Sequence, residues 1–77
     1  MNTYELNEDQ IARIEARLNL KHLDITEGIS KGDPEQATRA IGWARGASMI
    51  LDEIGYDPVW DSEKERVYLR RHGDVQQ

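Results

Sequence analysis

The six residues KGDPEQ, at positions 31–36, combine a signal that ends one helix with a signal that begins another. Gly32 can take the left-handed conformation that closes a helix at its carboxyl end. Asp33 can accept hydrogen bonds from the first free amides of the next helix, Pro34 suits its first position, and Gln36 stands where a capping-box partner would. Because only about three residues separate the two segments, we expect two helices that lie antiparallel.

Residues 31–36 are called here the corner between the two helices. The residues before this corner have the pattern of a long amphipathic helix. Asn7 is a suitable N-cap, and Gln10 stands three positions later as its capping-box partner. Apolar residues and one histidine then recur at steps of three and four, which is one face of an α-helix. This face comprises Ile11, Ile14, Leu18, His22, Ile25 and Ile29, and a neighbouring stripe comprises Ala12, Ala16, Leu20 and Leu23. We therefore predict a helix over about residues 8–30 with a wide apolar face.

The residues after the corner predict a second helix of similar length, over about residues 34–54, ended by Gly55. Its main apolar face comprises Ala37, Ala40, Ala44, Ala47, Leu51 and Ile54. Four alanines on this seam allow the two helix backbones to approach closely. Gly42 and Gly46 form a second strip of small residues on another side, which predicts a further close helix contact.

Residues 56–77 form a C-terminal appendage, for which the favoured interpretation is a β-hairpin. Short strands at 59–60 and 67–69 would be joined by a turn at 61–65. Val, Tyr and Leu stand next to one another in the second strand, between charged flanks. Such a run suits a strand better than a helical stripe.

The alternative for the same appendage is a short third helix, begun at Ser62 and ended by Gly73. In either case Tyr56, Trp60 and Tyr68 should fold back over an end of the helical pair. The last four residues, 74–77, are expected to fray.

The composition predicts a single small domain over residues 1–77 whose apolar core is too small to make it stable alone. Of the 77 residues, 38% are apolar and 32% are charged, and the chain contains no Phe and no Cys. Without cysteine it has neither a disulfide nor a thiolate metal site to reinforce the core. The predicted fold is therefore mainly α, a long antiparallel helical hairpin (about 8–30 and 34–54) that packs with further copies into a homo-oligomeric helical bundle.

Charge and hydropathy place the chain away from membranes. The formal net charge is −5, with acidic residues in excess over 1–63 and basic residues in excess over 64–77. The first residues have no basic start and no apolar run of the kind a signal peptide needs, and no segment approaches a transmembrane stretch. We expect a cytoplasmic protein without a membrane partner.

The sequence carries no recognisable catalytic or cofactor motif, and we expect neither an enzyme nor a metal or cofactor site. His22 lies on the apolar seam of the first helix, where a packed structural histidine is favoured over a titrating switch or a metal ligand. The only other histidine, His72, lies far away in the appendage. Asp52 and Glu53 are adjacent on a helix and therefore point about 100° apart, so they do not converge as an acid–base pair.

The second helix has more apolar and aromatic side chains than a two-helix core requires. They mark an association surface for a protein partner or for further copies, unless Trp60 and Tyr68 cover them. The interface candidates are Ile41, Trp43, Gly46, Met49, Ile50, Trp60 and Tyr68. We therefore expect a small non-enzymatic interaction protein, an adaptor, inhibitor or regulator that acts through protein–protein contacts.

The alternative function is a nucleic-acid-binding regulator. Arg66, Arg70 and Arg71 cluster beside Tyr68, and such a basic element could lie along a phosphate backbone. The acidic remainder of the chain and the lack of a recognition helix disfavour this function. In size and composition the chain resembles the small accessory proteins of bacteria and phages, although it carries no motif specific to them.

Overall fold

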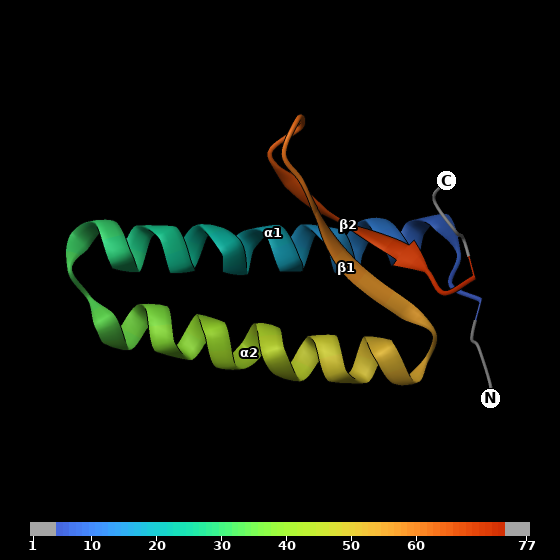
Figure 1. Cartoon of the computed structure of the whole chain (residues 1–77), viewed down its shortest axis with the longest axis horizontal. Coiled ribbons are helices and arrows are strands. Elements are labelled where there is room, and N and C mark those ends of the chain that lie inside the picture. Colours follow the sequence, from blue (N-terminus) through green and yellow to red (C-terminus); the bar gives the residue numbers. More distant parts are fainter. Residues whose placement is uncertain (1–4, 74–77) are drawn as a thin grey trace.

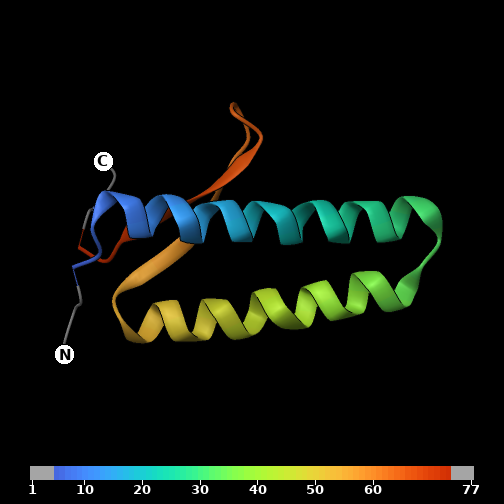
Figure 2. The same cartoon turned by 180° about the vertical axis from the view of Figure 1, so that it is seen from behind.

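The computed structural model describes residues 5–73 and consists of two helices followed by a two-stranded antiparallel sheet (Figure 1). The elements are α1 (Glu8–Lys31), α2 (Pro34–Glu53), β1 (Tyr56–Asp61) and β2 (Arg66–Arg71). The two helices lie side by side and antiparallel, and the β-hairpin crosses them near the end that holds the start of α1 and the end of α2 (Figures 1 and 2). Over residues 5–73, neither helix is long and apolar enough to cross a lipid bilayer.

The predicted helical hairpin and β-hairpin are both confirmed, and the alternative third helix does not form within residues 5–73. The strands are longer than predicted, with six residues each, and the turn is correspondingly shorter. Asp61 belongs to β1, and its side chain accepts hydrogen bonds from the amides of Glu63 and Lys64 at 3.0 and 3.2 Å. The Asp61 carboxylate therefore stabilises the turn that follows it, within the region 61–65 where the sequence predicted a turn. The predicted fraying of 74–77 lies outside the described residues.

The helix ends are set by the predicted caps. The Asn7 side chain accepts from the Gln10 amide at 2.8 Å, and the Gln10 side chain accepts from the Asn7 amide at 2.9 Å, which completes the capping box. Gly32 closes α1 with a φ of 72°, in the left-handed region that glycine enters without strain. At the other end of α2, Gly55 has a φ of 95° and turns the chain into β1.

Gln36 does not play the capping-box part that its position predicted. Asp33 caps α2 by accepting from the Gln36 amide at 3.2 Å, but the Gln36 side chain turns away and donates to Glu27 Oε1 at 3.2 Å. This bond from Gln36, together with Lys31, lowers the pKa of the Glu27 carboxyl. The side chain therefore ties the two helices together across the corner.

The alanine seam of α2 packs against α1 as predicted, and the closest approach occurs at Gly28. Ala37 and Ala40 are buried, and a β-carbon built at Gly28 would lie only 2.8 Å from the Ala37 backbone nitrogen. By contrast, apart from the adjoining residues and the backbone of α2 itself, no atom of the described residues lies within 4 Å of a β-carbon built at Gly42 or Gly46. The helix contact predicted at those two glycines is therefore not made within residues 5–73.

The apolar face of α1 is narrower than predicted. Leu20 and Leu23 are each 61% exposed, and Ala12 and Ala16 are exposed as well. Their stripe points away from α2, and the hairpin covers only the adjoining side of α1. Helical periodicity marked this stripe as apolar, but among residues 5–73 no second element packs against it.

Along the outer edge of β2, two side chains of α1 make hydrogen bonds to the backbone in the place where a third strand would pair. Asn19 accepts from the Val67 amide at 2.7 Å and donates to the Val67 carbonyl at 2.9 Å, while Glu15 accepts from the Leu69 amide at 2.8 Å. These amides of β2 therefore point away from β1. By the alternation of an antiparallel pair, the backbone groups of their partners in β1, Trp60 and Pro58, point away from β2. Pro58, which has no N–H, thus stands where the ladder needs no donor.

The core lies where the hairpin meets the helices. Leu18, Leu51 and Tyr56 form its buried centre, and the Tyr56 hydroxyl accepts from the Leu6 amide at 3.1 Å. The half-buried side chains packed around it come from both helices, from the residues next to them and from β2: Leu6, Ile14, Ala47, Ile54, Val67 and Leu69. The appendage therefore supplies part of the core, as expected for an aromatic residue that folds back over the helical pair.

Candidate functional site

One side of α2 carries a tryptophan and an isoleucine that the β-hairpin of residues 56–71 leaves uncovered. Trp43, Gly46 and Ile50 recur at steps of three and four and thus share one side of the helix, called here the Trp43 face. Trp43 is 39% exposed and Ile50 is 67% exposed. The hairpin approaches α2 from the opposite side, where Ala44 and Ser48 line a groove with it. The hairpin residues therefore do not cover the Trp43 face.

The rim of the Trp43 face is charged. Lys21 Nζ lies 5.4 Å from the centre of the Trp43 ring, close enough for a cation–π interaction. Lys21 also pairs with Asp24 at 3.7 Å, and a shallow hollow beside the tryptophan is further lined by Gln36, Arg39 and Ala40. An apolar centre with a polar rim is the usual anatomy of a protein–protein contact.

The other two candidates on α2 point elsewhere. Met49 is 71% exposed and, from its helical spacing, lies opposite the buried Ala37–Ala40 seam. Ile41 shares the side of Ser48, beyond the part of α2 that the hairpin contacts. The interface candidates on α2 therefore do not form one patch, and only Trp43, Gly46 and Ile50 share a face.

Trp60 and His22 form an aromatic contact between the hairpin and α1. Their ring centres lie 4.5 Å apart with an angle of 32° between the planes. They line an open groove of about 290 Å³ together with residues of both helices, including Leu18, Ile25 and Ala44. The His22 ring thus packs against the hairpin. Tyr68 lies on the other face of the hairpin and lines a separate polar hollow with Glu15, Asp61, Lys64 and Arg66.

The three arginines proposed for nucleic-acid binding are not presented on one free surface. Arg66 pairs with Glu15 at 3.0 Å and Arg71 pairs with Glu5 at 3.2 Å. Because side chains alternate along a strand, Arg66 and Arg70 share a face of β2 and Arg71 lies on the other. This arrangement weakens the case for an arginine cluster that tracks a phosphate backbone.

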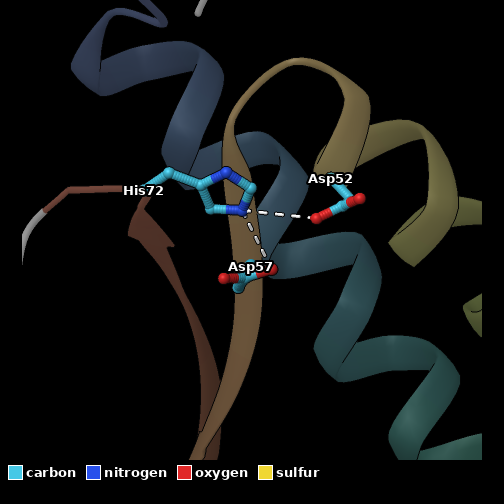
Figure 3. Close-up of side chains that lie close together, drawn as sticks. All are labelled: Asp52, Asp57 and His72. Carbon is cyan, nitrogen blue, oxygen red and sulfur yellow. Dashed lines mark ion pairs between the residues drawn. The ribbon is translucent and has the colours of Figure 1, made fainter. Parts of the chain in front are cut away.

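A second cluster joins groups that the sequence analysis kept apart (Figure 3). Asp52 comes from the last turn of α2, Asp57 from β1, and His72 from the residue after β2. His72 Nε2 lies 3.4 Å from Asp52 Oδ1 and 3.1 Å from Asp57 Oδ1. Asp52, which the sequence analysis considered only beside Glu53, thus converges with two residues from other elements.

The strand pairing brings these three residues together. Tyr56 lies opposite Arg71 in the sheet, so the residues next to this pair, Asp57 and His72, meet at the open end of the hairpin. The His72 amide also donates to the Gly55 carbonyl at 2.7 Å, which holds the histidine against the end of α2. No motif in the sequence marks this cluster, because it depends on the register of the sheet.

Comparisons with known protein families, with curated proteins and with solved structures found no match to this chain.

Proposed function

We propose that this chain is a small interaction protein, of the adaptor, inhibitor or regulator type, that acts through protein–protein contacts and not through catalysis. We further propose that it associates with a second copy of itself through the Trp43 face. The observation that supports both proposals is the exposure of Trp43 and Ile50 side by side on one helix.

The core supports the need for association. Within residues 5–73 the buried apolar side chains are few, and two of them are alanines that bury little area. They comprise Leu18, Ala37, Ala40, Leu51 and Tyr56. Full burial of a Leu, Ile or Phe-sized side chain contributes about 1.5–3 kcal/mol. Covering the Trp43 face would therefore add stabilisation comparable to that of the existing core side chains.

The shape of the Trp43 face fits another helix. Gly46 lies between Trp43 and Ile50 with open space above it, so a second backbone can approach closely there. Two copies of the same face can pack on each other about a two-fold axis, which places the four helices of two chains together. Tryptophan at the centre of such a contact commonly carries much of the binding energy.

The mass of the chain in solution tests this proposal. Sedimentation equilibrium should give a dimer or larger species for the unmodified chain, and salt should favour association because it screens the repulsion between copies of net charge −5. Ile50→Glu should shift the mass toward that of one chain. Leu20→Glu is the matched control, because Leu20 is similarly exposed but lies on the outer side of α1. A monomeric unmodified chain, or an unchanged mass for Ile50→Glu, would overturn the proposal.

A further inference from the structure

We propose that Asp52, Asp57 and His72 form a binding site for a divalent transition-metal cation of the zinc type (Figure 3). Each residue offers one ligand atom, and these atoms all lie within 4.8 Å of one another. The three side chains come from three different segments, so their convergence is a property of the fold and not of one local run of acidic residues.

The distances fit a small coordination sphere. A tetrahedral zinc centre with bonds of about 2.0–2.2 Å holds its ligand atoms about 3.3–3.6 Å apart. The imidazole nitrogen of His72 lies 3.4 Å from the Asp52 oxygen and 3.1 Å from the Asp57 oxygen. These two distances therefore need to change by only a few tenths of an ångström, and the two carboxylate oxygens, which lie within 4.8 Å of each other, would draw together on a shared ion.

A single proton on His72 Nε2 cannot serve both carboxylates equally. A ring nitrogen carries at most one hydrogen, so it can donate to one of the two facing carboxylates but not fully to both. A metal ion at the same place accepts a lone pair from the nitrogen and from each carboxylate. One imidazole with two carboxylates suits zinc and its neighbours, whereas Mg²⁺ and Ca²⁺ prefer all-oxygen sites.

The end of α2 supplies an independent reason for a cation here. The carbonyl end of a helix is negative and favours basic residues, yet the last turn of α2 carries Asp52 and Glu53 and no basic residue. Arg70 lies opposite Asp57 in the sheet, and the nearby Arg71 is paired with Glu5. A bound cation would compensate the acidic helix end and would tie α2, β1 and the end of β2 together in a chain without cysteine.

Calorimetry with the tag-free, metal-free full chain at slightly alkaline pH tests the site. Zn²⁺ should bind with one ion per chain and should raise the thermal unfolding midpoint, even in the presence of excess Mg²⁺. His72→Gln and Asp57→Asn should each weaken zinc binding at least tenfold. His22→Gln is the matched control, since it removes the other histidine of the chain and should bind zinc as the unmodified protein does.

Three results would overturn the proposal. They are the absence of saturable zinc binding, equal affinity in His72→Gln, and a loss of binding in His22→Gln that matches the loss in His72→Gln. If His72→Gln loses its helical circular dichroism without metal, Asp52→Asn decides instead, because Asp52 is exposed and its replacement leaves the core intact. Cobalt adds a direct readout, since a tetrahedral Co²⁺ centre at these ligands should absorb in the visible range, and Asp52→Asn should weaken that absorption.

Discussion

Gly28 of α1 and Ala37 of α2 face each other with no room for another carbon atom between them. A β-carbon at Gly28 would lie 2.8 Å from the Ala37 nitrogen and 3.2 Å from the Ala37 β-carbon. The contact sits next to the corner, where Asp33 also approaches Gly28. The two helices can therefore approach this closely at the corner because Gly28 has no side chain.

Gly28→Ala should destabilise the fold because the backbone of α2 would have to move away. We expect a loss of about 1–3 kcal/mol, as for other overpacked sites, measured by urea unfolding. Gly42→Ala is the control, because it adds the same carbon to an open helix surface and should stabilise by about 0.5–1 kcal/mol. A neutral effect of Gly28→Ala would show that the helices can separate freely.

Asn19→Ala should loosen the hairpin from α1. The substitution removes both hydrogen bonds to the Val67 backbone, and we expect a cost of about 1–3 kcal/mol in urea unfolding because the freed groups are partly buried. Asp9→Ala is a suitable comparison, since it breaks an exposed ion pair with Arg13 that should contribute at most about 1 kcal/mol. Equal effects of the two substitutions would count against a docking role for Asn19.

Tyr56→Phe should isolate the contribution of one buried hydroxyl. The ring stays in the core, but the Leu6 amide loses its acceptor, at an expected cost of about 0.5–1.5 kcal/mol in thermal unfolding. Tyr68→Phe serves as the reference because that ring lies in an open polar hollow. The interpretation fails if Tyr68→Phe costs as much.

Lowering the pH should weaken the hydrogen bond from Gln36 to Glu27, which joins the two helices at the corner. The hydrogen bond from Gln36, then the one from Lys31, lower the pKa of Glu27 below its ordinary value of 4.5. Because the folded pKa is lowered, the stabilisation is present above that ordinary value and is lost as pH falls through the folded pKa. Gln36→Ala should raise the pKa of Glu27, as followed by carboxyl NMR titration, while Gln10→Ala should leave it unchanged.

Nucleic-acid binding by Arg66, Arg70 and Arg71 should be weak. Two of these arginines are already paired with carboxylates, and a few phosphate contacts would not survive moderate salt. A fluorescence anisotropy titration with short DNA and RNA should show no saturation at physiological ionic strength. Saturable binding that Arg70→Gln abolishes would restore the regulator hypothesis.

The sequence predicted the features whose signals lie close together in the chain. Gly32, Asp33 and Pro34 define the corner within three positions, and the alanine seam of α2 repeats within a single helix. The favoured strand at 67–69 lies inside β2. Each of these signals depends on local backbone preference or on helical spacing, and the structure confirms them.

The features that were missed depend on which distant segments meet. Asn19 and Val67 are 48 residues apart, and nothing in either neighbourhood announces their bond. Helical periodicity also marked Leu20 and Leu23 as apolar positions but could not show that the hairpin would leave them exposed. The cluster of Asp52, Asp57 and His72 required the register of the sheet, which a single sequence does not supply.

The two edges of the sheet bear on the risk that this protein aggregates through strand pairing. Asn19 occupies the backbone groups of β2 that an incoming strand would pair with, and Pro58 interrupts the row of donors along the outer side of β1. Strand-by-strand growth into fibrils is therefore obstructed on both sides of the hairpin. Replacing Asn19 and Pro58 together should therefore increase aggregation by strand pairing, even in a variant that still folds.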